Sequence, residues 1–206
     1  MHMDRRQFVK NLGLGTASLS MGSLVTASSC APSGDSSLKQ NVKEGEDGQF
    51  LFIGDDIAIA QTEYGKVQGY LLNHVYTFLG VPYGADTSGK NRFMPPQKPE
   101  PWTDVRPAVF YGNTAPQRME NRWPNNYGTF ADHWNYWDVS EDCLYLNVWT
   151  PGIADGKKRP VLVWLHGGGF TNGSGIEQDG YHGENISREG NIVFCSINHR
   201  LGPIGF

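Results

Sequence analysis

Three consecutive glycines, Gly167 to Gly169, follow an apolar run and a histidine in the stretch PVLVWLHGGGF, residues 160–170. Glycine adopts backbone angles closed to other residues, and it lets another molecule approach the chain with no Cβ in the way. A strand that ends in such a loop leaves its sheet at the carboxyl edge, where open α/β sheets bind ligands. We therefore expect outward-pointing backbone N–H groups at this loop.

Three kinds of binding loop could use those N–H groups, and two of them need residues that are missing here. A dinucleotide fingerprint requires G-x-G-x-x-G, but Asn172 stands where the third glycine belongs. A phosphate-binding P-loop would fit the spacing of Gly168 and Gly173, but Ser174-Gly175 replaces the required Lys-Ser pair. The third kind is an oxyanion hole, whose donors meet the negative oxygen formed during ester attack. A glycine turn that only reverses the chain is the alternative without chemistry.

The composition is that of a globular protein and does not fit a nucleic-acid partner. The chain has 206 residues, of which 38% are hydrophobic and 12% aromatic, enough to build the core of one ordinary domain. The net charge is -4, and the basic residues are scattered, so we expect no nucleic-acid partner. No cluster of cysteine and histidine has the spacing of a metal site, and no cofactor is expected.

The first 29 residues have the layout of an export signal. An arginine pair precedes a weakly apolar stretch, residues 12–25, as in a bacterial twin-arginine signal. Small residues then lead to Cys30, which cleavage would leave as a lipid-carrying N-terminus for membrane attachment. A buried amphipathic helix is the alternative. Residues 30–49 are polar and without periodicity, which indicates a flexible linker. We expect an exported protein, periplasmic or on the outer surface.

The remaining residues, 50–206, alternate short apolar segments with turns. Residues 65–70 and 75–80 predict an antiparallel hairpin. Six prolines between residues 92 and 117 predict an irregular wrap over other elements.

Three strands are predicted in the second half of the chain, at residues 143–149, 160–165 and 191–197. The last two are nearly continuous apolar runs, which favour central strands buried on both faces. A short helix fits residues 180–190. The pattern predicts an α/β architecture, incompletely displayed.

Ordered motifs between residue 64 and the end of the chain resemble the type-B carboxylesterase family. That family contains cholinesterases, lipases and the non-catalytic neuroligins. The stretch SEDCLYLNV at residues 140–148 resembles its second signature. The other motifs, in chain order, are FLGVPY (78–83), RF with PP (92–96), PW (101–102), PQ (116–117), HGGGF (166–170) and NHRLGPIGF (198–206).

The resemblance implies an incomplete α/β-hydrolase fold, with an N-terminal antiparallel hairpin and the first strands of the central mixed sheet. It also implies hydrolysis of a small-molecule carboxylic ester by a serine with a histidine and an acidic partner. Gly168 and Gly169 would be the oxyanion donors, while His166 and Gly167 would shape the loop.

No serine in this sequence has glycine at both flanking positions of a G-x-S-x-G elbow. The resemblance therefore implies the N-terminal part of a longer enzyme, truncated before the elbow and inactive by itself. A neuroligin-like binding module and a truncated pseudogene product are the alternatives.

Further candidates lie around the loop. The resemblance implies that Arg92 and Glu141 form a structural ion pair. His166 and Phe170 are candidates for lining the substrate pocket. Trp134 and Trp137 belong to an aromatic stretch, residues 123–138, which either forms a lip over the pocket or packs on itself.

Two cysteines, Cys143 and Cys195, lie in apolar runs within the predicted domain. Buried free thiols are expected, with a disulfide between them as the alternative.

Overall fold

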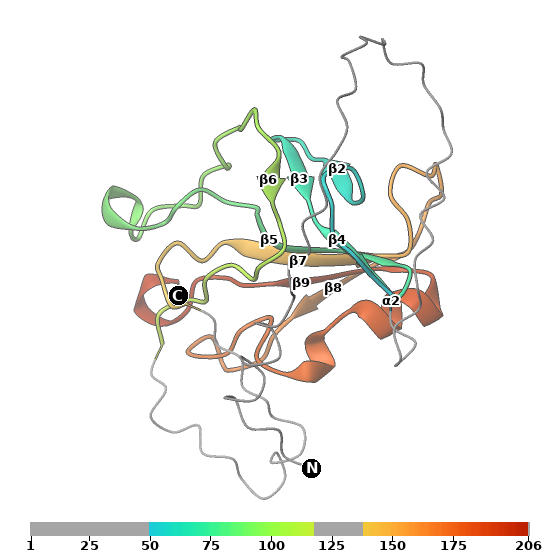
Figure 1. The fold of residues 1–206 in the computed structure, drawn as a ribbon. Helices are drawn as coiled ribbons and strands as arrows, with labels where there is room; N and C mark the ends of the chain where they lie inside the picture. The colour runs from blue at the N-terminus through green and yellow to red at the C-terminus, as the bar shows by residue number, and fades with distance from the viewer. Residues whose placement is uncertain (1–49, 118–137, 206) are drawn as a thin grey trace, which may run out of the picture. The chain divides into compact units, whose positions relative to one another are not determined.

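A computed structural model describes residues 50–117 and 138–205 of the chain. Its main element is a six-stranded sheet in the order β1-β4-β5-β7-β9-β8 (Figure 1). Neighbouring strands run antiparallel except β8 and β9, which are parallel. The strands are β1 (Leu51–Phe52), β4 (Tyr70–Leu72), β5 (Val75–Pro82), β7 (Tyr145–Thr150), β9 (Val193–Ile197) and β8 (Val161–Leu165).

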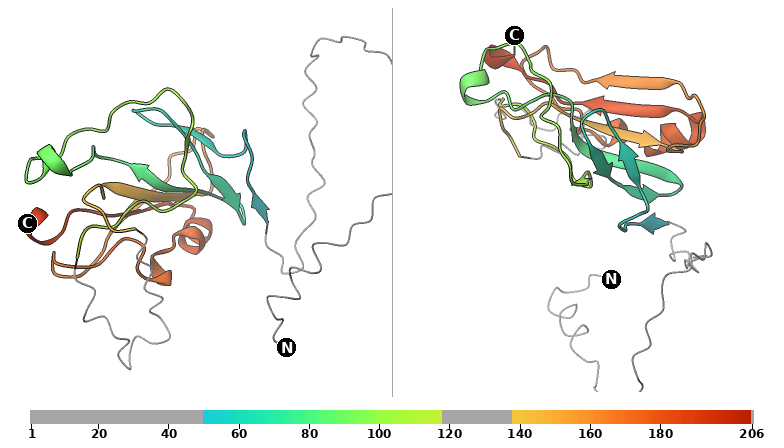
Figure 2. Two further views of the ribbon diagram at one scale, coloured as in Figure 1. Left: turned by 60° about the vertical axis from the view of Figure 1, so that its left-hand side comes forward. Right: turned by 90° about the horizontal axis from the view of Figure 1, so that it is seen from above.

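A small second sheet and one helix lie on opposite sides of the large sheet (Figures 1 and 2). The small sheet has the order β2-β3-β6. Its strands are β2 (Ile59–Gln61), β3 (Lys66–Gln68) and β6 (Arg106–Pro107), and the helix is α2 (Glu184–Gly190). Three short 3₁₀ helices complete the regular structure in the described ranges: η1 (Gly89–Asn91), η2 (Asp179–Tyr181) and η3 (Gly202–Ile204).

Each side of the large sheet carries its own hydrophobic core. Successive side chains of a strand point to opposite faces, so β5 contributes Phe78 to one core and Leu79 to the other. The core beside the small sheet contains Ala58, Val67, Phe78, Val81 and Ala108. The core beside α2 contains Val75, Leu79, Trp149 and Phe194.

The predicted hairpin is present but differs in its first strand. Asn73 and His74 form a tight turn with φ of 47° and 67°, and β4 pairs with β5 across it. Residues 65–70 do not form one strand. The N–H of Gly69 donates to the backbone oxygen of Ala58, and the chain passes at Gly69 from β3 in the small sheet to β4 in the large sheet. The second strand continues beyond residue 80 to Pro82, past an irregularity between Phe78 and Val81.

The three strands predicted in the second half are confirmed as β7, β8 and β9, each within two residues of the predicted ends. The short helix is also confirmed, as α2. Burial of β8 on both faces was a wrong prediction: its five residues are 37–64% exposed. The reason is its place at the end of the sheet, where β9 is its only partner strand among the described residues.

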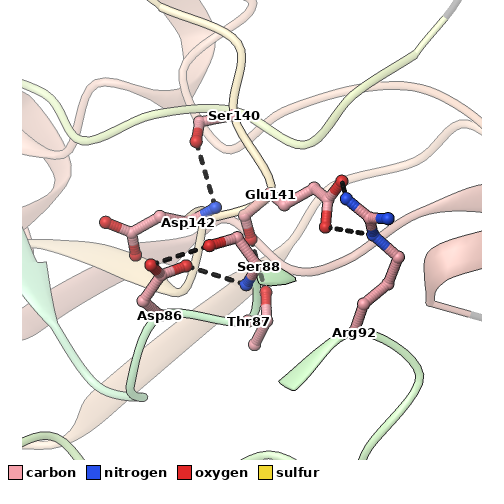
Figure 3. A network of polar contacts seen from close by, with 7 residues as sticks. All are labelled: Asp86, Thr87, Ser88, Arg92, Ser140, Glu141 and Asp142. Carbon is pink, nitrogen blue, oxygen red and sulfur yellow. Dashed lines mark hydrogen bonds and ion pairs between the residues drawn. The ribbon is translucent and has the colours of Figure 1, made fainter. Parts of the chain in front are cut away.

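An ion pair joins the proline-rich wrap to the segment before β7 (Figure 3). Arg92 donates from Nε to Oε2 of Glu141 at 2.7 Å and from a terminal nitrogen to Oε1 at 2.6 Å. The hydroxyl of Thr87, just before the wrap, donates to the backbone oxygen of Glu141 and adds a second link to the segment before β7. The two hydrogen bonds from Arg92 to the Glu141 carboxylate give directional specificity as well as attraction.

Several sequence-based predictions fall outside the described ranges and stay predictions. They concern the export signal (residues 1–29), the linker (30–49), a lipid on Cys30, and Trp134 and Trp137 of the aromatic stretch. Within the described ranges, no helix is long and apolar enough to cross a membrane.

The exposed β8 predicts self-association of the 206-residue chain, since an apolar edge strand offers unpaired backbone groups to another copy. Val163, in the middle of β8, is 54% exposed. We expect Val163→Lys to raise the soluble fraction after expression several-fold, measured by ultracentrifugation and size exclusion. The matched control is Val105→Lys, which adds the same charge at an exposed valine outside the strands. Equal gains from both variants would show that net charge, not the β8 edge, controls solubility.

The ion pair predicts a pH-dependent contribution to stability. Hydrogen bonds from Arg92 lower the pKa of Glu141 in the folded chain. The contribution is therefore complete above the unfolded carboxyl pKa of about 4.3 and is lost as pH falls through the lower folded value. We expect Glu141→Gln to lower the urea midpoint at pH 7 and to lower it less at pH 3.

Both measurements use the Val163→Lys background to keep the protein in solution. The control is Glu63→Gln, since Glu63 lies 3.4 Å from Lys98 and its side chain is 70% exposed. A Glu141→Gln deficit that is equal at both pH values would contradict the electrostatic account.

Candidate active site

The glycine loop, residues 166–173, begins where β8 ends at Leu165. Because β8 and β9 run parallel, their carboxyl ends meet at the same edge of the sheet. The rings of His166, after β8, and His199, after β9, stack there with centroids 4.5 Å apart and planes 7° from parallel. The loop therefore lies at the edge that the sequence predicted.

The first peptide unit of the loop is oriented by His166. Nδ1 of His166 lies 2.8 Å from the backbone oxygen of Gly167. A carbonyl oxygen can only accept, so Nδ1 carries the proton in this contact. In a planar trans peptide the C=O and the following N–H point in opposite directions. With the oxygen of Gly167 directed to the imidazole, the N–H of Gly168 points away from it.

The second peptide unit is oriented by the turn that follows. The backbone oxygen of Gly168 accepts from the N–H groups of Thr171 and Asn172, both at 3.2 Å, and from the Thr171 hydroxyl at 3.0 Å. The N–H of Gly169 therefore points out of the turn. Neither the N–H of Gly168 nor that of Gly169 donates a hydrogen bond within ranges 50–117 and 138–205, and both residues are exposed.

The backbone angles explain two of the glycines in the loop. Gly168 has φ of 123° and Gly169 has φ of 60°. A Cβ at Gly168 would also overlap the backbone oxygen of Asn172. Phe170 has φ of 62°, which is uncommon for a non-glycine residue. Its backbone oxygen is held by the N–H of Gly202 at 2.7 Å.

A pocket of about 370 Å³ lies beside the loop and is mainly apolar. His166 and Phe170, the two candidates for lining residues, are both on its wall, together with Tyr83, Leu144, His199 and Arg200. Burial raises the pKa of Tyr83 to about 12, so its hydroxyl stays protonated and donates to the backbone oxygen of Asn198 at 2.7 Å. Arg200 donates to the backbone oxygen of Met94 at 2.8 Å.

Glu141 is not directed to this pocket, because its carboxylate pairs with Arg92 (Figure 3). Cys143 and Cys195 are buried free thiols, as expected. Burial raises the pKa of Cys143 to about 12 and that of Cys195 to about 11. The thiols are therefore poor nucleophiles at neutral pH.

Two amide side chains that sequence reasoning did not select hold the glycine loop and the residues just after it. Asn198, only 2% exposed, accepts from the N–H of Gly175 at 2.8 Å and donates to the backbone oxygen of Asn113 at 3.0 Å. Gln117 contacts Gly173 through both ends of its amide. Both residues occur in the motifs quoted above. They lie outside helices and strands, so no periodic pattern in the sequence indicates which groups their amides contact.

Comparison with known proteins identifies relatives of the chain. The model of the carboxylesterase family matches residues 56–206. Phenmedipham hydrolase of Pseudarthrobacter oxydans is 44% identical over 148 residues, which cover 72% of this chain and 29% of that protein. Para-nitrobenzyl esterase of Bacillus subtilis is 39% identical over 151 residues, covering 72% and 28%.

Among solved structures, an esterase from Clostridium hathewayi that can hydrolyse aliphatic aromatic polyesters superposes with a TM-score of 0.67 at 37% identity. The match covers 77% of this chain and 30% of that one. The chain thus spans less than a third of the length of these relatives. The family match and the structural likeness together show that the chain belongs to the carboxylesterase family and forms part of an α/β-hydrolase fold.

Proposed function

We propose that this chain supplies the oxyanion hole of a serine carboxylesterase that hydrolyses small-molecule carboxylic esters. The observation that carries the proposal is the outward direction of two successive peptide N–H groups, at Gly168 and Gly169, beside an apolar pocket. Polypeptide outside these 206 residues would supply the serine in a G-x-S-x-G elbow, a histidine and its acidic partner.

In this mechanism the serine attacks the ester carbonyl, and the histidine takes the serine proton and passes it to the leaving alcohol. Negative charge develops on the carbonyl oxygen as the tetrahedral intermediate forms. The N–H groups of Gly168 and Gly169 would donate to that oxygen. Because the loop already holds them in place, no reorganisation is needed at the moment of reaction.

The pocket favours an uncharged ester, since its wall as a whole is mainly apolar. Two relatives, a phenmedipham hydrolase and a para-nitrobenzyl esterase, are named for small organic substrates, which supports this class. The sequence-based export signal would place the reaction outside the cytoplasm.

A neuroligin-like binding module is the alternative, because no serine in this sequence lies in a G-x-S-x-G elbow. The codons that follow Phe206 in the gene distinguish the two functions. A G-x-S-x-G elbow there favours the esterase, and an elbow in which another residue replaces the serine favours the binding module.

We expect the 206-residue chain to hydrolyse p-nitrophenyl acetate no faster than buffer does. A polypeptide that joins the chain to a serine-bearing remainder of the domain should show steady turnover. The measurement is release of p-nitrophenol at matched protein concentration, with the Val163→Lys form of the chain as the soluble sample. Steady turnover by the chain alone would mean that another group in it acts as the nucleophile.

In the serine-bearing polypeptide, we expect Gly169→Pro to lower kcat roughly 10²- to 10³-fold, the typical cost of one oxyanion donor. Proline has no N–H and cannot adopt the φ of 60° found at this position. The matched control is Gly156→Pro, which imposes the same strain at a φ of 69° in an open turn. A kcat unchanged by Gly169→Pro, with the variant folded, would exclude Gly169 as a donor.

A further inference from the structure

We propose that Gln117 is a positioning residue of the oxyanion hole, which fixes the direction of the Gly168 N–H through Gly173. The proposal rests on the proposed function, since it assigns Gln117 a part in that same site. It goes beyond the two glycines because Gln117 lies in a distant segment of the chain and acts through Gly173.

Gln117 makes a two-pronged contact with Gly173, which is 56 residues away in sequence. The N–H of Gly173 donates to Oε1 of Gln117 at 2.8 Å. Nε2 of Gln117 donates to the backbone oxygen of Gly173 at 2.9 Å. Both backbone polar groups of Gly173 are thereby held by one side chain, which restricts its rotation as well as its position.

Gly173 in turn lies against the start of the glycine loop. Gly173 has φ of 107°, and a Cβ there would overlap the backbone oxygen of Gly167 and contact Nδ1 of His166. Those two atoms form the hydrogen bond that orients the first peptide unit. Gly173 therefore lies against the contact that directs the Gly168 N–H, and a shift of Gly173 displaces it.

Gln117 is itself held in place by the wrap from which it extends. Nε2 of Gln117 also donates to the backbone oxygen of Ala115 at 3.1 Å. Ala115 is 2% exposed and packs with Cys143, Leu144 and Leu201. The adjacent Thr114 is fixed by backbone bonds to residues 138 and 140. The side chain thus extends from a buried, hydrogen-bonded part of the wrap.

The test compares Gln117→Leu with Gln97→Leu in the serine-bearing polypeptide. Leucine keeps much of the side-chain volume and removes both hydrogen-bonding ends. Gln97 is the matched control, because within the described ranges its exposed amide bonds only to the nearby backbone oxygen of Pro95. Burst titration with a p-nitrophenyl ester counts the active sites, so that loss of folded protein is not mistaken for loss of rate.

We expect Gln117→Leu to lower kcat per active site on the order of tenfold to a hundredfold, the range that a small displacement of a catalytic group produces. KM should change less than about twofold, because the donors act on the transition state rather than on the bound ester. Gln97→Leu should change neither constant. An unchanged kcat per active site in Gln117→Leu, even with a lower melting temperature, would overturn the proposal.

A second readout separates this proposal from the proposed function. Hydrogen–deuterium exchange of peptides that cover residues 166–173 should be faster in Gln117→Leu than in Gln97→Leu. If the parent polypeptide shows no turnover and this difference is found, the esterase function fails while the positioning of the loop stands. Equal exchange in both variants would contradict the positioning role whether or not the parent hydrolyses esters.

Discussion

The opposition of C=O and N–H within a trans peptide is the constraint on which the active-site account depends. The loop does not hold its two donors directly. It holds the oxygens of Gly167 and Gly168, one with an imidazole and the other with a turn. Each held oxygen turns the N–H of the same peptide unit outward. The two donors are thus positioned while remaining available to a ligand.

The sheet delivers this loop to its place. β8 and β9 run parallel, so that His166 and His199 reach the same edge and stack on each other. The wrap contributes Gln117, and Asn198, after β9, bonds both to the wrap and to Gly175, just after the loop. Three parts of the chain that are distant in sequence therefore meet around the glycine loop. The same arrangement leaves β8 as an exposed edge in the described structure.

Structural features that depend on residues close together in the sequence were predicted well. The apolar runs gave three strands, and the missing residues of the other two loop types left an oxyanion hole or a plain turn for Gly167 to Gly169. What failed depends on pairing between distant segments. The burial of β8 could not be judged from its own residues, because burial follows from its position in the strand order. The split of residues 65–70 between two sheets depends on Ala58 as the partner of Gly69.

The contact of Gln117 with Gly173 was not predictable for a related reason. A glutamine after a proline has no pattern that names its partner, and Gly173 is far along the chain. The thiols were easier, since Cys143 and Cys195 lie in the apolar runs of two predicted strands, which indicates burial, and the structure confirms that both are buried.

The most direct measurement of the central claim is a crystal structure of the serine-bearing polypeptide with a phosphonate bound covalently to its serine. The tetrahedral phosphonate carries an oxygen where the oxyanion would form. The account predicts that this oxygen lies about 2.7–3.1 Å from the backbone nitrogens of both Gly168 and Gly169. A phosphonate oxygen that is instead bound by other donors or by solvent, with both glycine N–H groups directed elsewhere, would contradict it.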